Sequence, residues 1–400
     1  MKKYHFEKLP LYSLFPLDSA EPVMDFSSDE EICRLIVNIF NGAGIKCEVR
    51  EIHHGSSVSL FELSIDTKKK VSSILAVSDK LAMALSVEDV RMLVPIPGKN
   101  TIGVEVPNKK RTIVGFGSMV DSLESENEMK IPIALGKDVY GQPVLMDLTR
   151  CPHLLVGGMN WEEKTTFLDS LICSILCTKT PDDVRLILVD TKVVELSVYN
   201  GVPHLLSPVI TDVERAFKAL EFVAKGLERR IELLTTTGSR KIEEYNAKVA
   251  ENPDAEKLPY IVVVIDDYAD LILSAGKEFE TLIKMITAVA RFCGIHLVLS
   301  TKMVSADVVT GVFKSNFPTQ IAFAVPNAIN SRILIDQTGA EKLLGFGDML
   351  YKNPMCRQPF RIQCASIDSE VEKIVSFLKA QGKPDYLDEL CFEETENENS

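Results

Sequence analysis

Two segments of the 400-residue chain carry residues whose types and spacing fit nucleotide chemistry. In the first, Gly158 is followed by Lys164 and Thr165, between an apolar run and a stretch with helical apolar spacing. This is the layout of a P-loop, in which backbone N–H groups and the Lys bind phosphates and the hydroxyl binds Mg²⁺. The pattern assigns Gly158, Lys164 and Thr165 to nucleotide binding, and Thr165 to the metal as well.

The second segment is the hydrophobic run from Ile261 to Ile265, which ends in Asp266 and Asp267. In P-loop enzymes an acid at this place helps to hold Mg²⁺, and a neighbouring acid can polarise the attacking water. A strand followed by an acidic turn fits the same residues equally well. The P-loop pattern upstream favours the nucleotide interpretation, with Asp266 as a metal residue.

The P-loop pattern has one defect, because Glu163 stands where the template G-x-x-x-x-G-K-[ST] requires its second glycine. Glycine there lets the backbone N–H groups form an anion nest. A non-glycine residue forced to positive φ costs about 1–2 kcal/mol. A carboxylate about 4 Å from a phosphate charge repels it by about 4 kcal/mol at an effective dielectric constant of about 20. We therefore expect weakened nucleotide binding.

The elements that must position these residues alternate between short strands and long helices from Ile131 onward, which predicts a mainly parallel sheet with helices on both faces. The longest helical pattern runs from Val213 to Leu234. The strands are expected at Leu154–Val156, Arg185–Val189, Ile261–Ile265, Ile295–Leu299 and Gln320–Val325.

A smaller α+β domain is expected before this α/β domain. It combines helical patterns beginning near Asp29 and Val71 with four strand-like runs, two of them joined by the turn Pro97-Gly98-Lys99-Asn100. The expected division is an extended lead-in at 1–27, the small domain at 28–118, the α/β domain at 119–386 and an acidic, disordered tail at 387–400. Residues 118–129 are expected to be a loop or linker.

Composition sets the broad class of the protein. The chain is 46% hydrophobic and has no apolar run of the roughly 18 residues that a membrane helix needs, so no membrane segment is expected. The N-terminus has no signal-peptide pattern and the nine cysteines form no C-x-x-C pair, which together indicate a cytoplasmic protein. A net charge of −13 argues against a protein coated in nucleic acid, although a basic channel lining is compatible with it.

Segments along most of the chain, from about residue 6 to 386, resemble the FtsK/SpoIIIE family of hexameric DNA translocases. The family's amino-terminal membrane helices and carboxy-terminal winged-helix domain lie outside the matched part. The segments that carry the resemblance include Phe61-Glu62-Leu63, Pro107-Asn108-Lys109-Lys110-Arg111, Pro152-His153-Leu154-Leu155-Val156, Gly294-Ile295-His296-Leu297, Ser331-Arg332-Ile333-Leu334 and Gly347-Asp348-Met349-Leu350.

The resemblance implies a RecA-like P-loop motor domain that forms a hexamer, passes double-stranded DNA through its channel and binds ATP with Mg²⁺ at subunit interfaces. It implies that Lys164 contacts the β- and γ-phosphates, that Thr165 and Asp266 support the Mg²⁺, and that Asp267 replaces the catalytic Glu. Arg332 is a candidate to act in trans on a neighbour's nucleotide, although an intersubunit salt bridge fits it equally. Arg240 and Lys241 resemble a DNA-contacting channel loop, and a solvated charged face is the alternative for them.

Four departures from the family pattern surround the expected site. Trp161 and Glu163 replace the later loop glycines, Asp267 replaces Glu, Lys302 replaces a Gln, and Gln320 replaces an Arg. We expect Trp161 to fill the emptied phosphate pocket in preference to stacking on a base. The departures together favour a motor homologue with impaired or lost hydrolysis.

Such a pseudo-ATPase would act as a non-hydrolysing subunit or regulator, in a homo-hexamer or in a mixed ring with an intact FtsK-like relative. The alternative is an active ATP-driven double-stranded DNA translocase with a deviant loop, serving chromosome or plasmid DNA segregation or transfer.

Overall fold

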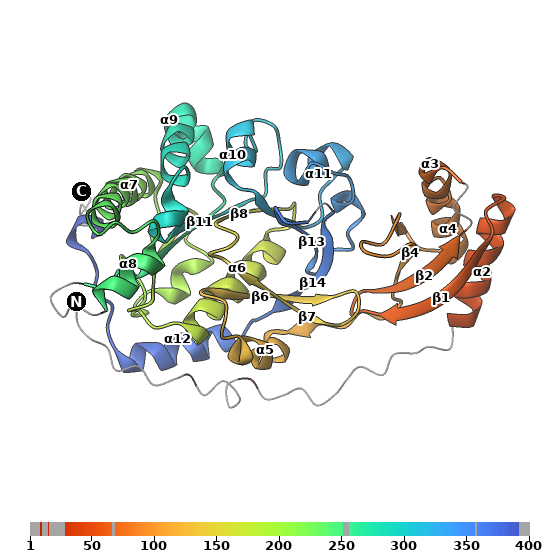
Figure 1. The fold of residues 1–400 in the computed structure, drawn as a ribbon, viewed down its shortest axis with the longest axis horizontal. Coiled ribbons are helices and arrows are strands. Elements are labelled where there is room, and N and C mark those ends of the chain that lie inside the picture. The colour runs from red at the N-terminus through yellow and green to blue at the C-terminus, as the bar shows by residue number, and fades with distance from the viewer. Residues whose placement is uncertain are drawn as a thin grey trace, which may run out of the picture.

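The computed structural model describes Leu9, Phe15 and residues 29–65, 69–250, 256–356 and 358–391. The remainder of the expected lead-in and residues 392–400 of the expected tail lie outside the described residues. Two sheets lie side by side (Figure 1). The small sheet is formed by strands before residue 108, and the large sheet is formed by strands from Val114 onward. In the described part of the chain, no helix is both long and apolar enough to cross a bilayer.

The small sheet has the strand order β1-β2-β4-β3, and all its neighbouring strands are antiparallel. Its helices cover one face, where Ile36, Phe40 and Leu81 pack with Phe61 and Val104 in one buried cluster. The elements are α2 (Asp29–Gly42), β1 (Cys47–His54), β2 (Val58–Ile65), α3 (Val71–Leu75), α4 (Ser78–Leu85), β3 (Arg91–Leu93) and β4 (Ile102–Pro107).

The large sheet has the order β7-β6-β14-β13-β12-β8-β11-β10-β9, and β5 pairs with β14 outside this path. The run from β12 to β9 is parallel, whereas β7, β6, β14 and β13 extend it in antiparallel fashion. The strands are β5 (Val114–Gly115), β6 (Pro132–Asp138), β7 (Pro143–Asp147), β8 (His153–Gly157), β9 (Val184–Asp190), β10 (Tyr260–Asp266), β11 (Ile295–Thr301), β12 (Thr319–Ala322), β13 (Asp348–Lys352) and β14 (Phe360–Ser366). The expected α/β fold class is confirmed, and the antiparallel extension was not expected.

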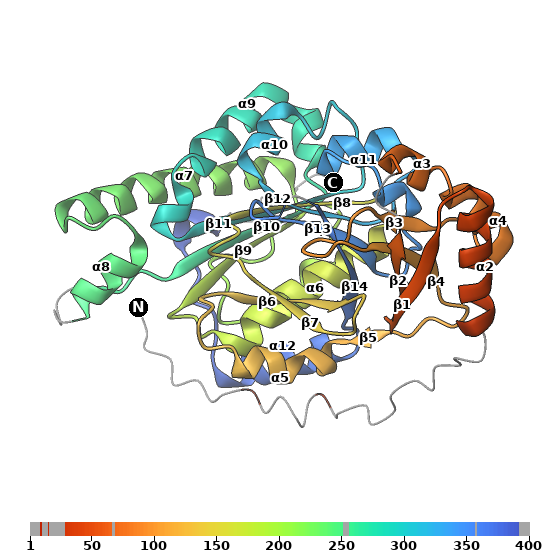
Figure 2. The same cartoon turned by 45° about the vertical axis from the view of Figure 1, so that its right-hand side comes forward.

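Helices cover both faces of the large sheet (Figures 1 and 2). Alternate residues of a strand enter different cores: Val262 and Val264 join the core with α6 and α12, and Val263 and Ile265 join the core with α7 and α9. Burial on both faces explains why these strands are apolar throughout. The helices are α5 (Val120–Ser125), α6 (Trp161–Thr178), α7 (Val213–Thr236), α8 (Ile242–Val249), α9 (Ala269–Thr287), α10 (Gly311–Asn316), α11 (Ala328–Ile335) and α12 (Glu370–Gln381).

Two segments expected to be irregular contain short helices. The expected linker at 118–129 holds α5 and the end of a 3₁₀ helix, and Met119, Val120 and Leu123 are buried there. At the start of the expected tail, a 3₁₀ helix buries Leu390 among residues of the core with α7 and α9. The 3₁₀ helices are η2 (Phe116–Met119), η3 (Leu196–Tyr199), η4 (Ala290–Cys293), η5 (Ala340–Lys342) and η6 (Asp388–Leu390).

A buried ion network joins the two sheets. Arg361 of β14 donates to Asp348 of β13 at 2.9 and 2.6 Å and to Glu105 of β4 at 2.7 Å. Arg91 of β3 donates to the other oxygen of Glu105 at 2.9 Å. Because Arg361, Asp348 and Glu105 are all buried, each charge depends on the others for its compensation.

We predict that Arg361→Ala lowers the free energy of unfolding by about 3–5 kcal/mol, because it leaves the buried carboxylate of Asp348 without its cationic partner and Glu105 with Arg91 alone. Denaturant titration followed by circular dichroism measures the loss. Arg34→Ala is the control, since it removes an exposed pair with Glu30 that is worth about 0.5 kcal/mol or less. Equal effects of the two changes would contradict the assigned role of the network.

Candidate nucleotide site

The candidate site lies at the carboxyl edge of the parallel strands, where ligands of α/β sheets bind. The register pairs Asp266 at the end of β10 with Asp190 at the end of β9, and Thr301 at the end of β11 with Gly157 at the end of β8. The sheet therefore brings the two sequence-predicted segments together.

The phosphate loop is short because α6 already begins at Trp161. Asn160 is the N-cap residue, and its side-chain oxygen accepts the backbone N–H of Glu162 at 3.1 Å. No residue from Gly158 to Thr165 has positive φ. The expected strain at the lost glycines is thus avoided, since the segment folds as the first turn of a helix and not as an anion nest.

Lys164 is buried, with 3% of its surface exposed, and its ammonium group bonds to the loop itself. It donates to the carbonyl oxygens of Gly158 at 3.0 Å and Asn160 at 2.7 Å. Burial lowers the pKa of Lys164 to about 8, against the opposing charges of Asp266 and Asp267. The side chain expected to hold phosphate therefore ties the short loop together.

The side chain of Glu163 points away from the phosphate loop. Its side chain is buried, and one carboxyl oxygen accepts the backbone N–H of Gly347 at 3.2 Å. Burial raises the pKa of this carboxyl, and the N–H of Gly347 partly offsets that effect. The expected repulsion by an ionised Glu163 facing a phosphate does not describe this arrangement.

Trp161 does not plug the phosphate pocket. It lies on the first turn of α6 with 55% of its surface exposed, so the expectation that it fills the pocket is wrong. The early start of the helix is the physical reason, because it projects this side chain outward into solvent.

The metal residues of the sequence analysis bond within the chain. Asp266 accepts the hydroxyl hydrogen of Ser300 at 2.5 Å. Burial raises the pKa of Asp266, and the nearby carboxylates of Asp190 and Asp267 act in the same direction. Burial and the carboxylates of Asp266 and Asp190 raise the pKa of Glu195, and the nearby Thr165 hydroxyl partly offsets that effect.

Asp267, the candidate catalytic acid, is buried between two ammonium groups. Lys192 bonds to its Oδ2, and Lys302 lies 3.4 Å from the same oxygen. Burial acts to raise the pKa of Asp267, but the bond and charge of Lys192, together with Lys302, hold it below the ordinary value. Its carboxylate therefore stays ionised and already has cationic partners.

Lys192 was missed in the sequence analysis. It follows β9, and the Asp190 carboxylate organises its loop by accepting the backbone N–H groups of residues 192 to 196. Its position in the sequence could have identified Lys192, because a residue just after a parallel strand lies at the same sheet edge as Asp266.

The remaining candidates lie apart from this cluster of contacts. Gln320 is buried within β12, where its amide group donates to the carbonyl of Phe317 and its carbonyl accepts from Lys352, each at 3.2 Å. Arg332 is exposed on α11, and Arg240 and Lys241 are exposed between α7 and α8. The trans-acting and DNA-binding roles stay predictions.

The residues as arranged do not fit a Mg²⁺–ATP complex. The loop forms no nest, Lys164 bonds to its own backbone, and Asp267 is taken up by Lys192 and Lys302. A phosphate group would have to displace these contacts in order to bind at this edge.

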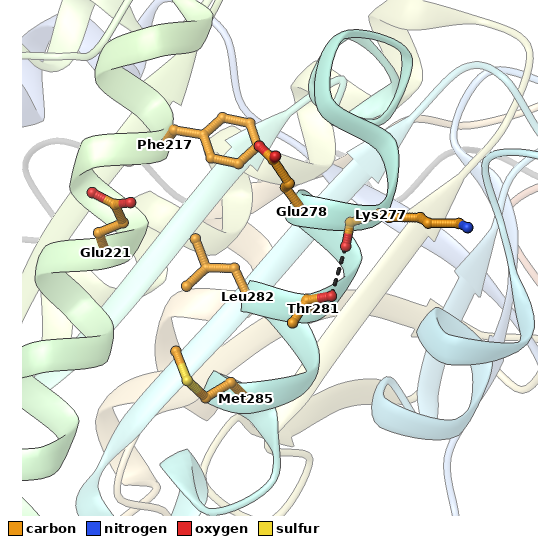
Figure 3. A pocket seen from close by; sticks show the side chains of 7 residues that line it. All are labelled: Phe217, Glu221, Lys277, Glu278, Thr281, Leu282 and Met285. Carbon is orange, nitrogen blue, oxygen red and sulfur yellow. Dashed lines mark hydrogen bonds between the residues drawn. The ribbon is translucent and has the colours of Figure 1, made fainter.

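A separate groove of about 420 Å³ lies between α7 and α9 (Figure 3). Phe217, Leu282 and Met285 form its apolar part, and Glu221, Lys277, Glu278 and Thr281 also line it. It shares no lining residue with the candidate site.

Comparison with known proteins gives two family matches. The FtsK/SpoIIIE family model matches residues 119–306, and the FtsK alpha domain model matches residues 9–108. The chain is 44% identical over 366 residues to DNA translocase FtsK of Treponema pallidum, covering 91% of this chain and 46% of that protein. It is 42% identical over 377 residues to DNA translocase SpoIIIE of Bacillus subtilis, covering 92% and 48%. The chain thus spans about half the length of the relatives it matches.

Solved structures are similar in fold. The pCW3 conjugation coupling protein TcpA, in a monomer form with ATPgS, superposes with a TM-score of 0.61 at 20% identity, over 88% of this chain and all of that one. The cytoplasmic domain of the Thermomonospora curvata type VII secretion ATPase EccC gives 0.58 at 21% identity, over 67% and 34%.

A partly buried acid of α6 makes the stability of the fold depend on pH. Asp169 of α6 accepts the Tyr199 hydroxyl hydrogen at 2.6 Å, and burial raises its pKa to about 7 from 3.8, aided by Glu195 and Asp266. The folded state therefore holds a proton that the unfolded state loses above about pH 4. This contribution to stability is complete below that pH and falls away as the pH rises to about 7.

We predict that Asp169→Asn stabilises the protein and that the gain grows by up to about 2 kcal/mol between about pH 5.5 and 7.5. The free energy of unfolding of both proteins, measured across this range, tests it. Asp307→Asn controls for the loss of one negative charge at an exposed position. A gain that stays constant or shrinks with rising pH would refute the assignment.

Proposed function

This chain belongs to the FtsK/SpoIIIE family, and on that premise we propose that it is a ring-forming, DNA-associated motor homologue with impaired or lost ATP hydrolysis. It acts as a non-hydrolysing subunit or as a regulator. The whole activity of the longer relatives is not assumed, because the chain spans about half of their length.

The contact of Asp267 with Lys192 and Lys302 carries the proposal. A catalytic acid acts on water only if its carboxylate reaches that water and can take part in proton transfer. Here two ammonium groups occupy the buried carboxylate and hold its pKa below the ordinary value, although burial acts to raise it. Lys302 stands where the family has a Gln, so two of the sequence departures contact each other.

The active translocase remains the second candidate function, and a specific observation favours it. Lys164, Thr165 and Asp266 are all retained, and the fold brings them to one sheet edge. If nucleotide displaces the internal bonds, Lys164 would hold the phosphates, and Thr165 and Asp266 would hold the Mg²⁺. The activity would then be ATP-driven movement of double-stranded DNA in segregation or transfer.

The proposed partners follow from the family. We propose a homo-hexamer or a mixed ring with an intact FtsK-like relative, with Arg332 acting in trans and Arg240 and Lys241 contacting double-stranded DNA. The proposed location is the cytoplasm. The proposed domains are residues 28–118 and the RecA-like motor at 119–386.

We predict no DNA-stimulated ATP hydrolysis by the wild-type chain above the level of Lys164→Ala. Phosphate release is measured with Mg²⁺, ATP and duplex DNA, with folding checked by circular dichroism. A fourfold variant, Trp161→Gly, Glu163→Gly, Asp267→Glu and Lys302→Gln, is the gain-of-function arm and should hydrolyse ATP faster than wild type. Wild-type turnover that depends on Lys164 would favour the active translocase.

We also predict assembly without nucleotide. Sedimentation velocity of the chain, alone and mixed with an intact FtsK-like motor, should show species larger than the monomer. Arg332→Ala should weaken them if Arg332 lies at the subunit interface. A strictly monomeric chain at high concentration, both alone and in the mixture, would contradict the ring proposal.

A further inference from the structure

The side chain of Glu163 ends at a strained loop formed by Gly345, Phe346 and Gly347. All three residues have positive φ, at 74°, 55° and 83°, and Phe346 is 85% exposed. A bulky residue in this conformation is uncommon and requires outside support. A Cβ on Gly345 would lie 3.5 Å from a carboxyl oxygen of Glu163, so the acid and the loop are in close contact.

The 345–347 loop is also held from the small domain and from β14. Gln363 of β14 donates to the carbonyl of Phe346 at 2.7 Å, and its own side-chain oxygen accepts the hydroxyl hydrogen of Ser57. Arg111 donates to the carbonyl of Leu344 at 2.8 Å, and its guanidinium lies 5.9 Å from the centre of the Phe346 ring.

The base of the loop belongs to the buried ion network. The backbone N–H of Leu344 donates to Asp348 at 2.9 Å, and Asp348 is the partner of Arg361. The 345–347 loop is therefore anchored where the two sheets meet. Glu163 adds the first turn of α6 to this junction.

We propose that Glu163 is a latch that couples the start of α6 to the junction of the two domains without nucleotide. A glycine at this position has no side chain to form the contact. The latch therefore arises from the same substitution that removes the phosphate nest. The inference concerns coupling within one chain and stands whether or not hydrolysis is lost.

The latch has an energetic cost, which argues against a merely stabilising role. The second carboxyl oxygen of Glu163 is buried and, among the described residues, has no hydrogen-bond partner. A buried polar atom without a partner is unfavourable, because it has given up its hydrogen bonds to water. The other carboxyl oxygen accepts the backbone N–H of Gly347, and this bond links α6 to a segment that is distant in sequence.

Hydrogen–deuterium exchange of the whole chain without nucleotide tests the latch. Glu163→Ala should speed amide exchange in residues 344–349 by about tenfold, because the N–H of Gly347 loses its acceptor. Glu163→Gln keeps a carbonyl acceptor and should stay within about twofold of wild type. Glu162→Ala removes a neighbouring exposed carboxylate and should change nothing there.

A second substitution tests whether Glu163 couples the 345–347 loop to the first turn of α6, and does not only stabilise the loop itself. Arg111→Ala, at the far side of the loop, should speed exchange in residues 161–165 of the wild type by about threefold or more. In the Glu163→Ala background it should have no further effect on them. Unchanged exchange at 344–349 in Glu163→Ala, or an equal Arg111→Ala effect in both backgrounds, would overturn the latch. ATP turnover enters neither readout, so this result is separable from that of the proposed function.

Discussion

The arrangement of the site depends on where α6 begins. With Trp161 and Glu163 in place of glycine, the segment after β8 does not adopt the left-handed turns of an anion nest and starts its helix early. The helical turn projects Trp161 outward, buries Glu163 against the 345–347 loop and lets Lys164 reach back to the carbonyls of Gly158 and Asn160. The first turn of α6 therefore sets the directions of three side chains.

The charges at the sheet edge balance within the chain. Lys192 and Lys302 compensate the carboxylate of Asp267, and Ser300 satisfies Asp266. A motor site normally relies on Mg²⁺ and phosphate to complete such a set of charges. Here side chains of the chain itself supply both the positive and the negative charges. Charge balance at this edge of the large sheet therefore does not require nucleotide.

Much of this could be predicted from local sequence. The strands β9, β10 and β11 are nearly continuous apolar runs, and α7 keeps a helical apolar period over 24 residues, so the predicted positions of these elements were close to correct. Asn160 with Glu163 three positions later also fits a helix N-terminus, a signal that the P-loop comparison obscured.

The rest depends on contacts between distant segments. The antiparallel strands β13, β14, β6 and β7 are set by pairing that no local pattern specifies. The direction of the Glu163 side chain depends on Gly347, and the environment of Asp267 depends on a lysine after another strand. The signs of the charges along the sequence do not reveal which charged side chains contact each other in the fold.

We infer that internal contacts of this chain take the place of bound nucleotide at the sheet edge. The most direct measurement is a titration of the wild type and of the Trp161→Gly, Glu163→Gly variant with a fluorescent ATP analogue and Mg²⁺. We expect restoration of both glycines to tighten binding by about tenfold or more, and addition of Lys164→Ala to the variant to remove the gain. Wild-type binding as tight as that of the variant would show that the internal contacts do not exclude nucleotide.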